Sequence, residues 1–274
     1  MVQLCDLRQT LADFPIELPV FHPVALNLTI MLSDPYSDID DVISTINEDQ
    51  SLASQVLKMA NSAAYVGLVK SETIKDAVVR LGARQITMLA MAASQASLHT
   101  SDDSMVNAIM KELWQHSLVT ALGCWWVAQN TGHQSIVDHA YLAGLMHDIG
   151  KLHLLKVLEH LAHDGQIVMD RESVLDVFTE MHVEQGSRIM KHWNIPPVYQ
   201  SVAANHHEPN YNSIDSLLTM VRLVNGVNRK IKISLNPEPF HVNDIQHEVN
   251  LLDMDEGQCK KLESVLISYR DISI

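Results

Sequence analysis

The segment YLAGLMHDIGKLHLL, residues 141–155, places the polar pair His147–Asp148 inside a run of apolar side chains. Apolar residues recur at helical spacing on both sides of the pair, at Leu142, Leu145, Met146, Ile149, Leu152 and Leu155. Burying a charged pair in such a stripe costs free energy unless the two side chains have partners. The segment therefore predicts a helical core, with polar partners for the pair supplied by other parts of the chain.

The rest of the sequence predicts an all-α fold. Hydrophobic residues make up 47% of the 274 positions and aromatic residues 5%, and this supply of Ala, Leu, Val, Ile and Met suits helices better than sheets. No regular alternation of apolar and polar residues indicates a sheet. About a dozen helices are expected, over residues 22–34, 37–49, 50–65, 73–82, 83–99, 102–130, 135–148, 151–163, 171–182, 183–194, 197–207, 213–231 and 256–272.

The polar stretch HTSDDSM, residues 99–105, predicts a hinge between two helical lobes of one domain. We expect an N-terminal lobe over residues 15–100 and a second lobe over residues 101–232, preceded by a short arm over residues 1–14. The remaining residues, 233–274, are expected to form a proline-containing loop and a C-terminal helix. The predicted architecture is a multi-helix bundle in two lobes.

Charge and cysteine content restrict the partners and the compartment. The formal net charge of −14 and the lack of a Lys/Arg cluster argue against nucleic acid and anionic membranes as partners. No apolar run is long enough to span a bilayer, and the N-terminus lacks a secretory pattern. The three cysteines, Cys5, Cys124 and Cys259, are far apart and odd in number, so we expect a protein of the reducing cytoplasm.

Several of the 15 histidines lie where helices could bring them together. Glu112 and His116 are four residues apart and therefore share one helical face. These two, the pair His147–Asp148, and the downstream His182, His206 and His207 are residue types that bind Fe, Mn, Ni or Zn through nitrogen and oxygen. Taken singly, each histidine also fits an ordinary hydrogen-bonded core residue, and spacing alone does not prove convergence.

Several separated motifs resemble a known family. The series of His116, LAGLMHDIGK, His182 and HH resembles the HD superfamily of metal-dependent phosphohydrolases. Upstream, the D-x-x-L start at Asp49, the ANSAAY turn over residues 60–65 and the AVVRLG helix over residues 77–82 are similar to the HDOD family. This resemblance covers roughly residues 15–232 and implies an HD-like helical fold. HDOD proteins are usually regulatory output modules in bacterial signalling.

The resemblance also implies a ligand set. Asp148 is the candidate bridge between two ions, because a carboxylate can bridge two cations and a neutral imidazole cannot. One ion would be held by His116 and His147, and the other by His182, His206 and His207. We expect one or two divalent ions, with Fe or Mn ahead of Ni or Zn.

Further residues in this pattern carry more specific expectations. Lys151 can offer its ammonium to a phosphate oxygen, although a solvated lysine is an equal alternative. Asn225 stands where HD enzymes place a final Asp ligand, and an amide oxygen carries no charge to offset a cation. Asp215 is a less favoured substitute for that ligand. Glu112 and Lys151 are similar to residues of the HD-GYP phosphodiesterases, but the GYP stretch itself is replaced by PNYNSID after Glu208.

Two functions follow from this pattern. The first is an HDOD-type regulatory protein with a metal site and signalling proteins as partners. The second is an active phosphohydrolase that acts on a phosphate-containing small molecule, a nucleotide or a cyclic dinucleotide, with Asp148 and Lys151 in its chemistry. Asn225 and the missing GYP stretch favour the regulatory protein.

Overall fold

The computed structural model describes residues 38–62, 64–65, 70–209, 214–235 and 245–270, together with the single positions 10, 14, 24, 27, 28, 31 and 272. Within these residues the chain is all-α, as the sequence predicts, and contains no strand. No helix in these ranges is long and apolar enough to cross a membrane. The arm predicted over residues 1–14, the helix over 22–34 and the loop over 234–244 lie largely outside the described residues.

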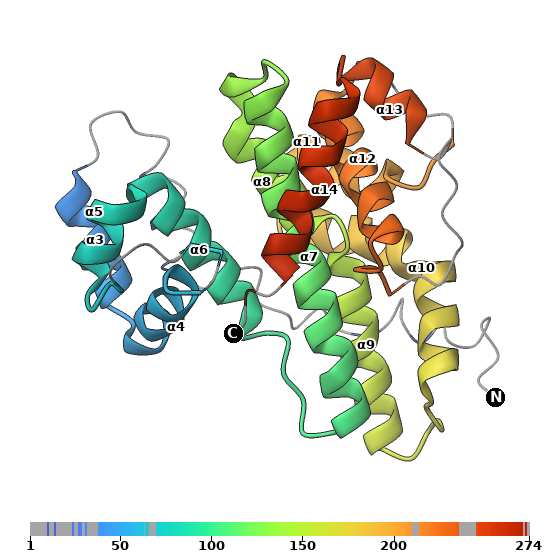
Figure 1. The fold of residues 1–274 in the computed structure, drawn as a ribbon. Helices are drawn as coiled ribbons and strands as arrows, with labels where there is room; N and C mark the ends of the chain where they lie inside the picture. Colours follow the sequence, from blue (N-terminus) through green and yellow to red (C-terminus); the bar gives the residue numbers. More distant parts are fainter. Residues whose placement is uncertain are drawn as a thin grey trace. The chain divides into compact units, whose positions relative to one another are not determined.

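The chain divides into two compact units, each described by itself (Figure 1). One unit comprises Pro19–Thr100 and Ile267–Ile274, and the other comprises Met1–Leu18 and Ser101–Leu266. The division after Thr100 falls in the polar stretch 99–105. The units differ from the expected lobes in that each takes in a segment from the far end of the chain.

The smaller unit contains four consecutive helices, α3 (Ile39–Asn47), α4 (Gln50–Ala60), α5 (Ile74–Leu81) and α6 (Ala83–Ala96). Helix α4 begins where the Asp49 carboxylate accepts from the backbone N–H of Leu52. Helix α5 begins with a reciprocal capping box between Thr73 and Asp76. Gly82, at a φ of +85°, turns the chain from α5 into α6.

The larger unit carries the predicted site residues. Its long helix α7 (Ser104–Asn130) packs along α8 (Val137–Met146), and α9 (Ile149–His163) packs along α10 (Arg171–His192). Helix α12 (Ser216–Lys230) packs on α7 and α8, and α11 (Pro197–Asn205) packs on α10 and α8. The remaining elements are the 3₁₀ turn η1 (Gln134–Ile136), α13 (Gln246–Leu251) and α14 (Glu256–Arg270), which belongs to this unit up to Leu266.

A hydrophobic core holds α7, α9 and α10 together. It is built from Val106, Ile109, Met110, Leu113, Leu154, Leu155, Val157, Leu158, Leu161, Val174, Val177, Phe178 and Met181, with Leu235. Residues 171–182 and 183–194, expected as two helices, form the single helix α10. Gly186 lies inside this helix without a positive φ, and a Cβ added there would lie 3.5 Å from the backbone nitrogen of Gly150 on α9.

Candidate metal centre

The pair His147–Asp148 lies at the junction of two helices. The sequence predicts one helix that ends at residue 148 and a next one that starts at residue 151; in the structure α8 ends at Met146 with His147 as its C-cap, and α9 begins at Ile149 with Asp148 as its N-cap. The Asp148 side chain makes no capping hydrogen bond. Its carboxylate is therefore not used by the helix and is available to side chains from other helices.

Two glycines beside the pair allow neighbouring helices to come close. A Cβ added at Gly144 would lie 2.8 Å from the Cα of Ala121 on α7, and one added at Gly150 would lie 2.0 Å from the carbonyl oxygen of His182 on α10. Both distances are far below van der Waals contact, so a larger residue would push the helices apart. The glycines thus bring α7 and α10 to the pair. The sequence analysis missed both positions, and isolated glycines inside a helical pattern are the signal that could have found them.

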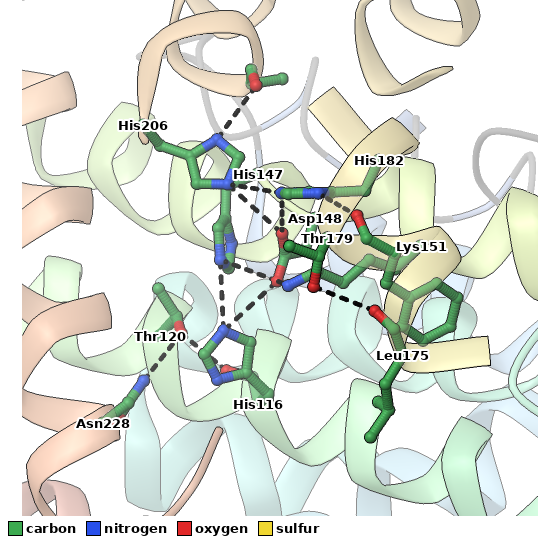
Figure 2. A network of polar contacts seen from close by, with 12 residues as sticks. His116, Thr120, His147, Asp148, Lys151, Leu175, Thr179, His182, His206 and Asn228 are labelled. Carbon is green, nitrogen blue, oxygen red and sulfur yellow. Dashed lines mark hydrogen bonds and ion pairs between the residues drawn. The ribbon is translucent and has the colours of Figure 1, made fainter. Parts of the chain in front are cut away.

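Four imidazoles converge on the Asp148 carboxylate (Figure 2). The Nε2 atoms of His147 and His116 lie 3.3 Å and 3.4 Å from Oδ2. The Nε2 atoms of His206 and His182 lie 3.4 Å and 3.7 Å from Oδ1. The site therefore has two sides, each defined by one carboxylate oxygen.

The outer nitrogen of each of these rings faces a backbone carbonyl. The Nδ1 atom of His116 lies 2.8 Å from the carbonyl oxygen of Ile233, and that of His147 lies 2.8 Å from the carbonyl oxygen of Gly144. The Nδ1 atom of His182 lies 2.5 Å from the carbonyl oxygen of Phe178, and that of His206 lies 3.0 Å from the carbonyl oxygen of Ala203. A carbonyl can only accept, so Nδ1 donates, and a neutral ring presents the lone pair of Nε2 to the centre. This is the arrangement by which proteins orient histidine ligands for a metal.

The protonation states suit a cation. Burial lowers the pKa of His182 to about 3 and also lowers the pKa of His206, so these rings are neutral at pH 7. Burial alone would raise the pKa of Asp148, but His147 and Lys151 outweigh it and hold that pKa well below its usual value. On the Oδ1 side the centre thus combines an ionised carboxylate with the neutral imidazoles of His182 and His206.

The ligand atoms form two groups that share Asp148. One group adds His182, His206 and His207, and the other adds His116 and His147; within each group the candidate ligand atoms lie within 4.8 Å of one another. His207 stacks at a tilt on His206, with ring centroids 4.2 Å apart, and is the exposed member. The structure thus places five histidines, all predicted from the sequence, around the carboxylate of Asp148.

Other predicted residues lie elsewhere or play different parts. Glu112 points away from the centre and is half-exposed, where its carboxylate accepts from Arg171 of α10 at 2.6 Å and 3.1 Å. Asn225 is buried in α12, and no hydrogen bond or ion pair in the described part of the chain joins it to the centre. Asp215 caps α12 by accepting from the N–H of Leu218 at 3.1 Å. Lys151 does lie at the centre, bonded to Asp148.

Residues that hold the ligands in place were not found from the sequence. Arg222 of α12 donates to the carbonyls of His206 and Glu208, at 3.0 Å and 2.9 Å, and pairs with the buried Glu248 of α13 at 2.9 Å. This guanidinium fixes the end of α11, where His206 and His207 lie. A backbone carbonyl such as that of Ile233 has no sequence signature at all.

Comparison with known proteins identifies the family. The HDOD domain model matches residues 18–209 of this chain. The chain belongs to the HDOD family. The match lies within the residues 15–232 over which the motifs resemble that family, and it ends before α12 and α13 begin. Those two helices of this HDOD protein therefore complete the centre from outside the matched segment.

Solved structures share the fold of this HDOD protein at low sequence identity. A Shewanella amazonensis protein named "Putative metal-dependent phosphohydrolase" is 23% identical with a TM-score of 0.71, over 97% of both chains. An HDOD domain protein of unknown function from Geobacter sulfurreducens is 22% identical with a TM-score of 0.72, over 96% of this chain and 94% of that one. A relative from Treponema pallidum, an uncharacterised protein, is 26% identical over 76% of this chain. The chain spans only 41% of the length of that relative.

The residues of this HDOD centre fit a divalent transition metal. Asp148 Oδ1 is buried and accepts no hydrogen bond, although its carboxylate is ionised. A buried anionic oxygen without a donor is costly, and a cation facing it removes that cost. Imidazole and carboxylate ligands suit Fe, Mn, Ni or Zn.

Proposed function

We propose that this HDOD protein is a regulatory module whose centre holds a divalent transition metal, Fe or Mn ahead of Ni or Zn. The observation that carries this proposal is the burial of the centre. His116, His147, Asp148, His182 and His206 are each exposed by only 2–6%. A substrate must reach the ion for turnover, whereas an ion that stabilises or switches a fold works behind a closed wall. The burial of these five residues supports the second role, and the exposed ring of His207 is the one opening of the ligand set.

The module is proposed to act through signalling proteins as partners. A metal that links α8, α9, α10 and α11 through Asp148, His182 and His206 would change the stability of this bundle when it binds or leaves. The free thiols of Cys124 and Cys259 support a reducing compartment, which we take to be the cytoplasm.

The alternative is an active phosphohydrolase that acts on a phosphate-containing small molecule. The exposed ring of His207, at the rim of the ligand set, favours this alternative because it gives the centre one open side. A divalent ion at Asp148 would supply Lewis acidity toward a phosphoryl oxygen. The ammonium of Lys151 would bind a phosphate oxygen after its release from Asp148.

One assay separates the two functions. Mn²⁺- or Fe²⁺-loaded protein is tested on a generic phosphodiester and on common cyclic dinucleotides, and its thermal unfolding is followed with and without metal. The regulatory module is expected to gain thermal stability from the metal and to show turnover below about 1 per second. Faster turnover that disappears in Asp148→Ala would establish the hydrolase instead. No gain of stability and no metal bound would refute both.

A further inference from the structure

The two oxygens of the Asp148 carboxylate differ in what they contact. Oδ2 accepts from the Nζ atom of Lys151 at 2.6 Å. Oδ1, on the side of His182 and His206, is buried without a hydrogen bond. One side of the carboxylate is thus already neutralised by a protein cation, and the other side is not.

The position of Lys151 is fixed by the fold. It lies one turn into α9, three residues after Asp148, and its backbone N–H donates to the Asp148 carbonyl at 2.9 Å. The residue is only 7% exposed. A lysine buried to this degree is almost always paired, and here its ammonium lies on the same carboxylate oxygen as His116 and His147. It is therefore not a solvated lysine but the cation paired with Asp148.

Charge and ligand number also separate the two sides. Asp148 is the carboxylate that both ligand groups share, and the other members of the groups are imidazoles. The Oδ1 side offers four residues and the Oδ2 side three. A divalent ion on Oδ1 together with the Lys151 ammonium already exceeds the single negative charge of Asp148. A second divalent ion would meet both cations at close range in a buried site, where like charges repel strongly.

We infer that the Lys151 ammonium takes the place of a second metal ion, so that the centre binds one ion, on the Oδ1 side, through Asp148, His182, His206 and His207. This inference rests on the proposed metal binding and adds its stoichiometry and its location. Lys151 is then a residue that limits metal loading. Its replacement by a neutral side chain opens the Oδ2 side to a second ion.

The test compares metal loading in Lys151→Met with the wild type. Methionine keeps the length of the side chain and removes its charge. Lys156→Met is the matched control, because Lys156 lies on the same helix but is 32% exposed and pairs with Glu159 at the surface. Each protein is loaded with Mn²⁺, freed of excess metal and analysed for Mn per chain by elemental analysis and electron paramagnetic resonance.

We expect one Mn²⁺ per chain in the wild type and in Lys156→Met, with the spectrum of an isolated ion. Lys151→Met should bind a second ion at least about 100-fold more tightly than the wild type does. Its spectrum should show exchange coupling between two ions. Two ions in the wild type, or one ion in a folded and Mn-loaded Lys151→Met, would overturn the inference and leave the proposed metal binding intact. No ion in either protein would overturn both.

Two further variants test the location without touching Lys151. His182→Ala should lose the Mn²⁺ of the wild type, whereas His116→Ala should keep it, because these residues belong to opposite sides of Asp148. Loss of the ion in His116→Ala with retention in His182→Ala would overturn the inference. This arm decides the question even if Lys151→Met does not fold.

Discussion

At the scale of the residue, Asp148 faces four imidazoles and one ammonium from a position that is 3% exposed. The carboxylate and Lys151 are mutually dependent, because each is a buried charge that the other offsets. Removing one partner of such a pair is far more costly than removing both. The metal-free protein should therefore respond to single and double substitutions in a non-additive way.

We predict that Asp148→Asn lowers the free energy of unfolding of the metal-free protein by about 3–5 kcal/mol, because Lys151 is left as an unpaired buried cation. The double variant Asp148→Asn/Lys151→Met should recover at least half of that loss. Urea unfolding in the presence of a chelator measures both quantities. A double variant as unstable as the sum of the single variants would show that the two charges are not coupled.

His153 gives a prediction about pH. Burial, with a smaller contribution from the nearby Arg188, lowers its pKa to about 4, so the folded state favours the neutral ring. The ordinary pKa of histidine is 6.5. The contribution of the neutral His153 ring to the free energy of unfolding is therefore full above pH 6.5 and is lost progressively as the pH falls from 6.5 toward 4.

Between pH 7 and pH 5 the contribution of His153 should fall by about 1–2 kcal/mol. His153→Leu should therefore lose that much less free energy of unfolding than the wild type over the same interval. Both proteins are compared without metal. The pKa of His182 is also lowered, and its titration reduces the free energy of unfolding at low pH by the same amount in both proteins. Equal acid sensitivity in the two proteins would contradict a neutral buried His153.

At the scale of the element, the close approach of α9 and α10 decides whether His182 reaches Asp148. The contact is asymmetric. A Cβ at Gly150 would lie 2.0 Å from the carbonyl oxygen of His182, whereas a Cβ at Gly186 would lie 3.5 Å from the nitrogen of Gly150, which is ordinary contact. Two glycines of the same helix pair should thus differ in what they tolerate.

Gly150→Ala is predicted to lower the free energy of unfolding by about 2–4 kcal/mol and to weaken Mn²⁺ binding at least 10-fold, because α10 must move away. Gly186→Ala should change the free energy of unfolding by less than about 1 kcal/mol and keep the affinity. Chemical unfolding and metal titration of the two variants test this. Similar losses in both variants would contradict the packing described for Gly150.

The helices themselves were largely predictable, and their junctions were not. The range expected for the long helix, 102–130, matches α7 closely because Asp103 caps it and apolar residues recur throughout. The break at His147–Asp148 has no proline and no polar run to mark it, and the boundaries expected there, the end of one helix at residue 148 and the start of the next at residue 151, each lie two residues too late. The boundary expected between residues 182 and 183 is wrong, because α10 continues through it without a break.

The candidate site was predictable in its residue types but not in its pairings. Helical spacing placed Glu112 beside His116, yet Arg171, distant in sequence, pairs with Glu112 at the surface. The pairing of Lys151 with Asp148 depends on the helix start at Ile149, two residues before the start expected from the sequence. The carbonyl of Ile233 and the guanidinium of Arg222 act through three-dimensional contacts that no local pattern encodes.

At the scale of the whole molecule, the centre belongs to the larger unit and depends on its last helices. Helices α12 and α13 lie beyond the residues 18–209 matched by the family model. Arg222 of α12 and Glu248 of α13 form an ion pair, and their side chains are only 17% and 3% exposed. Arg222 also donates to the carbonyl of His206. The chain after residue 209 is thus part of the site.

Glu248→Gln should lower the free energy of unfolding by about 3–5 kcal/mol, because it leaves a largely buried Arg222 without its charge partner. It should also weaken Mn²⁺ binding by about 10–100-fold through the displaced His206. Glu263→Gln, in the exposed pair with Lys230, is the control and should cost less than about 1 kcal/mol. Unchanged metal affinity in Glu248→Gln would show that α13 does not support the centre.

The central claim is that one divalent ion binds on the Oδ1 side of Asp148. A crystal structure of the Mn²⁺-loaded protein, with anomalous differences collected near the Mn absorption edge, tests it most directly. We expect a single anomalous peak within coordination distance of Asp148 Oδ1, His182, His206 and His207, with Lys151 still bonded to Oδ2. An absence of any peak in a fully loaded crystal, or a peak between His116 and His147 in place of Lys151, would contradict it.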